Sequence, residues 1–153
     1  MIQLKAIGTV HNGIGQGHRD TPWEEIESTI TVDEEWRDAL DGLEGFTHIW
    51  VLFFFDRMPA IDSQRGHPMA RDDMPIVGRF ATRSPMRPNP IGMTAVRLLE
   101  RRGTTLRVRG LDAIEGTPVL DIKPYLPRRD AIASSDVPEW ARKYWGPSDE
   151  GSA

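Results

Sequence analysis

The sequence predicts an all-β or β-dominated fold, a single barrel of about seven short strands joined by short helices and long loops. Short runs of apolar, β-branched and aromatic residues recur along the chain, and segments rich in glycine, proline and aspartate separate them. The regular alternation of strands with long helices, typical of a doubly wound parallel sheet, is missing. These two observations favour a barrel.

The N-terminal third contains two expected strands. Leu4–Val10 reads as the first strand and is followed by a glycine-rich loop over His11–Asp20. In Ile26–Val32, apolar and polar residues alternate within a β-branched run, which is the pattern of a strand with one buried face.

A short helix and a central strand are expected next. Asp33 is a plausible N-cap for a helix over 34–41, and Gly42 supplies its end. Phe46–Phe55 is almost continuously apolar and aromatic, so we expect a strand buried on both faces.

The second half contains a long polar loop and several short strands. Loops as long as the one expected over 57–74 are often functional or mobile in small domains. Arg101-Arg102-Gly103 resembles a hairpin connection between two of the strands. The strands expected here are Ile76–Thr82, Met93–Glu100, Thr104–Gly110 and Val119–Ile122.

The end of the chain is more polar. Pro138–Tyr144 is expected to form one helical turn or more. We therefore predict one domain over 1–145 and a disordered tail over 146–153.

Composition bounds the class of protein. The chain has 153 residues, 39% of them hydrophobic and 27% charged, as in an ordinary globular domain. It contains no cysteine, which excludes disulfides, thiolate catalysis and cysteine-ligated metal. A basic-then-apolar signal pattern is absent, and the longest apolar run, Ile49–Phe55, is too short to cross a bilayer. A cytoplasmic protein is the expectation.

Charge is distributed unevenly. The net charge of -4 argues against a strong stand-alone nucleic-acid binder. However, residues 79–109 contain eight arginines against the single acid Glu100, whereas residues 1–78 hold fourteen acids against six basic residues. Two interpretations stay open, a solvated strand face balanced by acidic loops and a local patch that attracts phosphate.

One loop contains an unusual density of proline. Three prolines lie between Ser84 and Pro90, and each fixes its own φ and restricts the residue before it. Arg83, Ser84, Arg87 and Asn89 are thereby offered in a nearly fixed arrangement, and preorganised donors lose less entropy on binding. The alternative is a rigid turn whose arginines face water.

This loop belongs to a motif, FATRSPMRPNPIG at residues 80–92, that resembles the signature of the tRNA (adenine-37-N6)-methyltransferase family, also called TsaA-like or UPF0066. Three further segments resemble that family in the same order along the chain, from about residue 2 to residue 127. They are Ile7-Gly8-Thr9-Val10, the aromatic run 46–55, and Gly110-Leu111-Asp112 with the stretch 116–125.

The resemblance implies a closed barrel that works as a homodimer. It also implies S-adenosylmethionine as cofactor and the anticodon loop of tRNA as partner, with N6 of adenosine 37 as methyl acceptor, in the best-known case already threonylcarbamoylated. Because the sulfonium leaving group is already activated, this chemistry needs no metal. Alignment of nucleophile and methyl group can supply up to about 7–11 kcal/mol.

Carried over residue by residue, the resemblance places cofactor contacts in three parts of the chain. We expect backbone amides around Gly116 and Thr117 to read the adenine edge, and acidic side chains to complement the sulfonium. The cofactor contacts implied are Asp56, Arg57, Arg83, Met93, Glu115, Gly116, Thr117 and Pro118.

The resemblance also suggests a substrate side. Arg87 and Asn89 would shape the pocket or contact the RNA. Asp121, Lys123 and Tyr125 occupy alternate positions of an extended run and so face one side. Asp121 is a candidate proton acceptor, Tyr125 a candidate stacking surface for the base, and Lys123 a substrate contact. The alternative for Asp121 and Lys123 is a structural ion pair at the barrel rim.

The chain departs from the longer bacterial members in two ways. Thr21-Pro22-Trp23 stands where those members carry a Pro-Arg-Gln motif, and the sequence ends without their extra C-terminal domain, so it resembles the short form. Two rival functions therefore stay open. The first is a methyltransferase of a small metabolite, and the second is a non-catalytic module that binds S-adenosylmethionine as a sensor.

Weaker signals favour ordinary structural roles. Gly13-Ile14-Gly15-Gln16-Gly17 lacks the third glycine of a dinucleotide fingerprint, because His18 stands there. His11 and His18 have no third ligand at a telling spacing, so metal binding is not expected. His48 reads as a core histidine of the aromatic strand.

Overall fold

The computed structural model describes residues 1–17 and 20–147, and the chain divides into two compact units. The first unit consists of Met1–Ala60 and Pro85–Tyr125, and the second of Ile61–Ser84 and Leu126–Ala153. Most of the expected disordered tail, residues 148–153, lies outside the described residues, as does His18.

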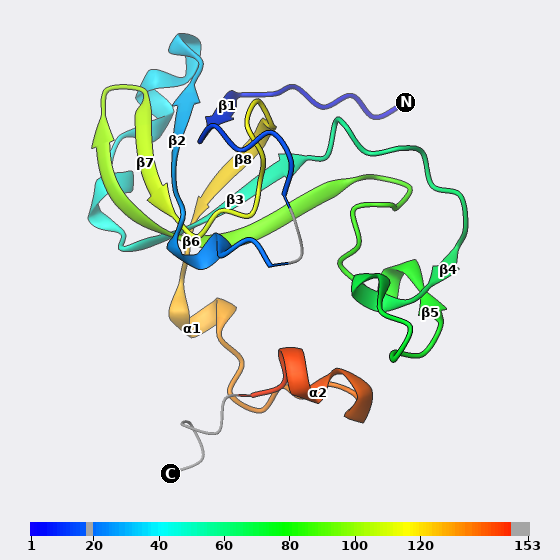
Figure 1. Ribbon diagram of the computed structural model, residues 1–153. Coiled ribbons are helices and arrows are strands. Elements are labelled where there is room, and N and C mark those ends of the chain that lie inside the picture. The colour runs from blue at the N-terminus through cyan, green and yellow to red at the C-terminus, as the bar shows by residue number, and fades with distance from the viewer. Residues whose placement is uncertain (18–19, 148–153) are drawn as a thin grey trace. The chain divides into compact units, whose positions relative to one another are not determined.

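The first unit is a closed antiparallel barrel of six strands in the order β1-β2-β7-β6-β3-β8 (Figure 1). The expectation of a β-dominated barrel is confirmed, with six strands in the barrel instead of seven. The strands are β1 Gly8–His11, β2 Glu27–Val32, β3 His48–Phe54, β6 Ile91–Arg102, β7 Thr105–Arg109 and β8 Pro118–Pro124. Three short 3₁₀ helices accompany them, η1 Trp23–Glu25, η2 Glu34–Leu40 and η3 Leu43–Gly45.

The core fills the inside of the barrel. Along β3 every second residue, Ile49, Val51 and Phe53, is buried, while the residues between them are half-buried. The expectation that β3 is buried on both faces is therefore wrong, because a closed barrel has a single apolar interior and its outer wall meets solvent or loops. Inward residues of the other five strands complete the core.

β1 is shorter at its start than expected. Gly8 pairs with Val32, the last residue of β2, so the residues before Gly8 extend past the end of β2, although the amide of Ile7 still donates to the carbonyl of Val119 in β8 at 2.8 Å. Ile2 and Leu4 are accordingly exposed. Gly8 also passes so close to β2 that a Cβ on it would lie 2.5 Å from the carbonyl oxygen of Thr31.

The expected helix forms as the 3₁₀ helix η2. Asp33 occupies the N-cap position with extended backbone, but its side chain makes no capping hydrogen bond. Gly42 has a φ of 88°, the left-handed conformation that glycine adopts without strain, and the chain leaves the helix there as expected.

β6 and β7 form the expected hairpin, with Gly103 at φ 58° in the turn. β6 is longer than predicted, with twelve residues, and a register shift between Leu98 and Glu100 marks a bulge. A bulge bends a strand, which helps a long strand to follow the barrel wall. Gly92 lies against a core ring, because a Cβ there would be 2.5 Å from Cε2 of Phe53.

The second unit has little regular structure. Its strands β4 Arg65–Gly66 and β5 Val77–Gly78 form a two-stranded sheet, accompanied by η4 Pro68–Ala70, η5 Arg79–Ala81, α1 Pro127–Asp130 and α2 Glu139–Trp145. None of the helices in the described part of the chain is long and apolar enough to span a bilayer.

Two expectations for this region are corrected. The strand expected over Ile76–Thr82 is reduced to the two residues of β5, because the chain turns into η5 after Gly78, which lies opposite Arg65, the first residue of β4. Arg79 holds that turn by donating from Nε to the carbonyl of Ser63 at 2.9 Å. The loop expected over 57–74 contains β4 and η4, whereas the helix expected near the C-terminus is present as α2.

Candidate functional site

The carboxylate of Glu115 lies at the centre of a hydrogen-bonded clamp at one end of the barrel. It accepts hydrogen bonds from the backbone amides of Asn12 at 3.1 Å and Gly13 at 2.9 Å, and Nδ1 of His11 lies 3.0 Å from it. The Gly13 amide is the largest cause that holds the pKa of Glu115 below its usual 4.5, and desolvation opposes it. The loop before β8 therefore presents an anchored anion at neutral pH.

Asn12 joins this clamp to the barrel wall. Its Nδ2 donates to Oγ of Ser28 at 3.0 Å and to the carbonyl of Ala113 at 2.8 Å. Its Oδ1 accepts the amide of Ile14 at 3.0 Å. Three segments far apart in the sequence, the end of β1, the start of β2 and the loop before β8, are thus tied together. Sequence analysis missed Asn12, since a single asparagine in a glycine-rich loop gives no distinctive signal.

Arg57 and Gly116 come together although they are far apart in the chain. Gly116 has a φ of 82°, and a Cβ built on it would lie 2.8 Å from Nη2 of Arg57. The guanidinium therefore lies against the bare backbone of Gly116. Two of the segments expected to contact the cofactor, the one after β3 and the one before β8, meet here within a single unit.

The backbone amides of this turn are already occupied. The amide of Gly116 donates to the carbonyl of Val10 at 2.8 Å, and the amide of Thr117 donates to the carbonyl of Ile114 at 3.2 Å. The hydroxyl of the buried Thr117 donates to the same carbonyl at 2.7 Å. The expectation is therefore wrong for these two amides, because the Gly116 donor ties the turn to β1 and the Thr117 donor closes the turn itself.

Met93 and Asp121 lie on the outer wall of the barrel. Leu52 of β3 is opposite Met93 of β6 on one side and Asp121 of β8 on the other, so the three residues form a row across three strands. Neighbouring strands are about 4.8 Å apart, which puts about 10 Å between Met93 and Asp121 along the row. Both side chains are accessible, and that of Met93 is 46% exposed.

Asp121, Lys123 and Tyr125 face the same side, as alternation predicted. Nζ of Lys123 lies 2.9 Å from the carboxylate of Asp121, so the ion pair named above as the alternative is present. The ring of Tyr125 packs against Trp50 with centroids 5.7 Å apart, and its centroid lies 6.4 Å from that of His48. His48 is therefore half-buried on the outer wall and not a core histidine.

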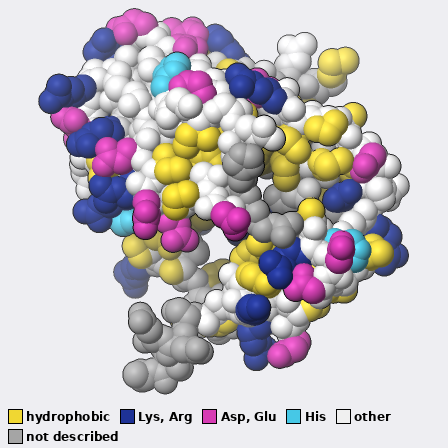
Figure 2. All heavy atoms as spheres, viewed as in Figure 1, with side chains coloured by type: hydrophobic (Ala, Val, Ile, Leu, Met, Phe, Trp, Pro, Cys, Tyr) yellow, Lys and Arg dark blue, Asp and Glu magenta, His cyan; other side chains and the backbone are white. Residues whose placement is uncertain are grey.

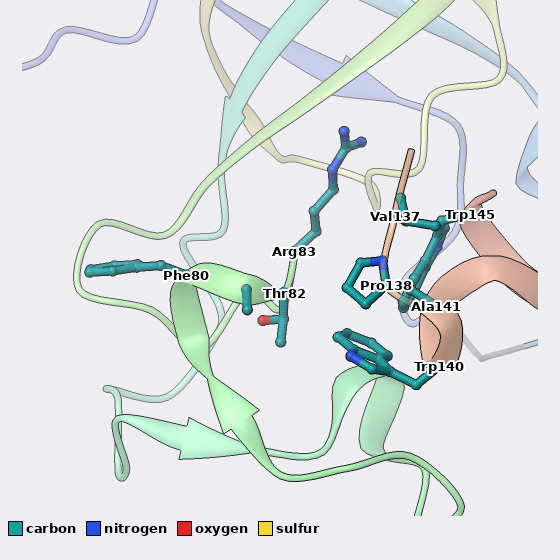
Figure 3. A pocket seen from close by; sticks show the side chains of 9 residues that line it. Phe80, Thr82, Arg83, Val137, Pro138, Trp140, Ala141 and Trp145 are labelled. Carbon is teal, nitrogen blue, oxygen red and sulfur yellow. The ribbon is translucent and has the colours of Figure 1, made fainter. Parts of the chain in front are cut away.

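Arg83 belongs to the second unit, where it lines a cavity of about 660 Å³ (Figure 3). The rings of Trp140 and Trp145 contribute to its wall and lie perpendicular to each other with centroids 6.3 Å apart. Phe80, Ala81, Thr82, Val137, Pro138 and Ala141 complete the lining. Sequence analysis missed these two tryptophans as lining residues. The available signal was that both lie in or directly after the short helix expected near the C-terminus.

The proline-rich loop crosses the boundary between the units. Arg83 and Ser84 belong to the second unit, whereas Arg87 and Asn89 belong to the first. The carbonyl of Asn89 accepts the amide of Ile91 at 2.7 Å, so the end of the loop is tightly turned. The fixed arrangement expected for Arg83 relative to Arg87 and Asn89 stays a prediction.

The arginine-rich stretch is largely neutralised by acids. Within the described residues, at least five of its eight arginines form ion pairs, namely Arg79 with Asp62, Arg101 with Asp41 and Glu44, Arg102 with Glu100, and Arg107 and Arg109 with Glu27. Figure 2 shows basic and acidic side chains interspersed on the face in view. Within residues 1–17 and 20–147, no group of three or more His, Asp or Glu gathers to hold a metal ion.

Comparison with known proteins gives consistent matches. The family model of the tRNA-methyltransferase O N-terminal domain matches residues 15–131. A probable S-adenosyl-L-methionine-binding protein of Methanothermobacter thermautotrophicus is 41% identical over 138 residues, which cover 86% of this chain and 95% of that protein. The tRNA (adenine(37)-N6)-methyltransferase of Escherichia coli is 41% identical over 110 residues, 65% of this chain and 45% of that enzyme.

A crystal structure of TrmO has a similar fold, with a TM-score of 0.73 and 30% sequence identity over 90% of this chain. This chain covers 63% of that structure and less than half of the Escherichia coli enzyme, but nearly all of the archaeal relative. The similarity to the two longer proteins is therefore a similarity to part of each.

Proposed function

This chain belongs to the family of the tRNA-methyltransferase O N-terminal domain, and from that membership we propose that it is an S-adenosylmethionine-dependent methyltransferase. Its proposed methyl acceptor is N6 of adenosine 37 in the anticodon loop of tRNA, in a base that already carries a threonylcarbamoyl group. The relatives named for S-adenosyl-L-methionine binding and for tRNA methylation support the cofactor and the reaction class.

The contact between Arg57 and Gly116 is the observation that carries the proposal. It joins two segments that the family resemblance assigns to the cofactor, and both belong to one unit. A glycine with positive φ leaves room for the guanidinium beside the backbone, where a Cβ would push the flexible end of Arg57 aside. The space left by the missing Cβ, here called the cradle, lets the charged end of Arg57 lie close to the turn before β8.

The residues around this cradle fit S-adenosylmethionine chemically. When bound, the cofactor supplies a methyl group activated by a positive sulfonium. Arg57 can hold a carboxylate through paired N–H donors, which suits the amino-acid end of such a molecule. Glu115 and Asp56 supply negative charge near the cradle, and Thr117 and Pro118 shape the turn beside it. Arg83 and Met93 are the further proposed contacts.

The acceptor side is proposed on the outer wall of the barrel. An exocyclic amine becomes more acidic as its new bond to carbon forms, so a nearby carboxylate assists by accepting the proton. Asp121 is the proposed acceptor, and Lys123 pairs with it at 2.9 Å. Tyr125 offers a face for the base, and Arg87 and Asn89 are proposed substrate contacts.

A homodimer and a cytoplasmic location are also proposed from the resemblance to the family. Light scattering in solution measures the first directly. A mass near twice the 17.3 kDa of one chain supports the homodimer, and a mass near 17.3 kDa contradicts it.

Calorimetric titration with S-adenosylmethionine and with its demethylated product tests the cofactor site. We expect micromolar binding that falls at least about tenfold in Arg57→Met, since a charge-assisted hydrogen bond is lost. The matched control is Arg37→Met, an exposed arginine paired with Glu34 on η2, which should bind like the unchanged protein. No binding by a folded protein contradicts the proposal.

Turnover is tested on two substrates. Anticodon stem–loops with and without the threonylcarbamoyl group are incubated with the cofactor, and the nucleosides are analysed by mass spectrometry. Methylation of the modified base supports the proposed reaction. Cofactor binding without turnover on either RNA favours the sensor module, and methylation of a metabolite fraction alone favours the small-molecule enzyme.

A further inference from the structure

A row of outward-facing side chains crosses the barrel wall from β2 to β8. The strand register places Glu27 opposite Arg109, Arg109 opposite Arg97, and Arg97 opposite His48. The amide of Tyr125 then donates to the carbonyl of His48 at 3.1 Å and extends the row. Their neighbours along the strands, among them Val96, Val108 and Ile49, fill the core, so the row faces away from it.

The charges along this row do not balance. Arg109 and Arg107 both pair with Glu27, at 2.9 and 3.1 Å. Arg97 lies directly opposite Arg109, and no acidic side chain in the described part of the chain forms an ion pair with it. Like charges directly opposite each other on neighbouring strands are destabilising. Because Arg97 is exposed, its guanidinium is accessible to an anion from outside the unit.

An aromatic surface adjoins this cation. Trp50 follows His48 on the same side of β3, and Tyr125 packs against both rings at 5.7 and 6.4 Å. Lys123, opposite Trp50 in the register, is 62% exposed and borders the aromatic group. With strands about 4.8 Å apart, Arg97 is one strand from His48 and two from Tyr125. A cation beside several π faces on an open sheet suits a nucleotide chain, which alternates phosphates with bases.

We propose that the outer wall formed by β7, β6, β3 and β8 binds a single-stranded stretch of RNA, with a phosphate on Arg97 and bases against Trp50 and Tyr125. The proposal rests on the tRNA methyltransferase function proposed above and extends it, since Arg97, His48 and Trp50 belong to none of the contacts assigned there. It also explains how a chain of net charge -4 holds RNA, namely through a local cationic position on a stacking surface.

Fluorescence anisotropy with a labelled anticodon stem–loop, titrated at several salt concentrations, tests this surface. Arg97→Gln should weaken binding about tenfold, and the slope of log affinity against log salt should fall by about one, because one phosphate contact is lost. Tyr125→Leu should also weaken binding about tenfold but leave the salt slope unchanged, because stacking releases no counterions.

The matched control is Arg102→Gln. Arg102 is on the same strand, is 82% exposed and pairs with Glu100 at the hairpin end, away from the aromatic group. Its removal subtracts the same charge from the protein, so we expect at most a twofold effect on RNA affinity. Equal losses for Arg97→Gln and Arg102→Gln overturn the proposal in favour of a general charge effect.

Calorimetry on the same variants separates this inference from the proposed function. Arg97→Gln should bind S-adenosylmethionine like the unchanged protein. If the unchanged protein methylates the stem–loop and Arg97→Gln keeps its RNA affinity, the RNA surface is refuted while the proposed function stands. If the unchanged protein binds no cofactor, the proposed function fails instead. If Arg97→Gln changes the mass in solution and not the RNA affinity, the surface joins two copies of the chain, which also overturns the proposal.

Discussion

The barrel and the second unit of this chain are held together by different forces. In the barrel, six strands close into a continuous ladder around an apolar core, and Ile30, Ile49 and Leu106 are fully buried there. The second unit has strands of two residues, and Phe80 is 81% exposed. Its side-chain contacts include local pairs such as Arg71 with Asp73, and the stacking of the Arg71 guanidinium on Tyr144.

This difference matters for the residues expected to contact the cofactor, because some belong to the barrel unit and others to the second unit. Arg57, Gly116 and Glu115 extend from a barrel whose register fixes their positions within one unit. Arg83 extends from a unit whose strands have two residues each and whose cavity is lined by Trp140 and Trp145. Since local stability follows buried apolar contact, the barrel with its loops and the second unit should differ in how often they open.

Amide hydrogen exchange gives the largest expected contrast. Amides in the ladder between β3 and β6 should exchange only on global unfolding, whereas those of Gly66 and Gly78 should exchange by local opening. With about 5–15 kcal/mol of global stability, protection should differ by at least about a thousandfold. Mass spectrometry of proteolytic fragments measures both regions in one experiment. Equal protection would show that the second unit unfolds only together with the barrel and would contradict a difference in local stability between the two units.

Removing a phenylalanine ring should lower the free energy of unfolding much more in the barrel core than in the second unit. Phe53 is 1% exposed and packs against Phe55 and the backbone of Gly92. Phe53→Ala should destabilise the protein by about 3–5 kcal/mol, through lost burial and a residual cavity. The control Phe80→Ala, at an exposed site, should stay within about 0.5 kcal/mol.

Urea denaturation followed by circular dichroism measures both phenylalanine variants. Phe53→Leu keeps most of the buried volume and provides a folded intermediate case if Phe53→Ala is too unstable to purify. A loss for Phe80→Ala as large as that for Phe53→Leu would mean that the second unit contributes equally to the cooperative core.

The acidic pairs of the two units should respond differently to substitution and pH. Glu115 joins segments more than 100 positions apart, whereas Asp73 pairs with Arg71 two positions away. Both carboxyl groups have a pKa held below the usual value, Glu115 chiefly by the Gly13 amide and Asp73 by Arg71. A lowered folded-state pKa stabilises the fold above the unfolded-state pKa, and that stability is lost as pH falls through the folded-state pKa.

Glu115→Gln should therefore lower the urea midpoint at pH 7, and the difference from the unchanged protein should shrink once the pH falls below about 4.5, the unperturbed value. Asp73→Asn should change the midpoint much less, because its partner is already close in the unfolded chain. Equal shifts for the two variants would contradict the importance of long-range ties in the barrel.

Much of the fold could be predicted because strand signals are local. The alternation in 26–32 predicted β2, the aromatic run predicted β3, and the glycine at 103 predicted the β6–β7 hairpin. The errors lie in the lengths of strands, because the length of a strand depends on how far its partner strand extends. Ile76–Thr82 has strand-forming residues but only a two-residue partner, and Leu4–Ile7 precedes the point where β2 ends.

The candidate site could be predicted only in part. The motif resemblance named Arg57 and Gly116, and alternation named the face shared by Asp121, Lys123 and Tyr125. Asn12 was missed, because its importance comes from bonds to Ser28 and Ala113, far along the chain. The amides of the 115–118 turn were misjudged for the same reason, since their acceptors include Val10 of β1.

By itself, the sequence determined the β class of this protein, its family resemblance and the alternation of buried and outward residues in 26–32. Those features depend on residue type and on a period of two along one strand. Only the tertiary structure decided that Arg97 lies opposite Arg109, that Arg57 rests on Gly116 and that Asn12 anchors the loop of Glu115. Register and barrel closure match residues far apart in the chain, and the free energy of such pairings depends on both partners at once.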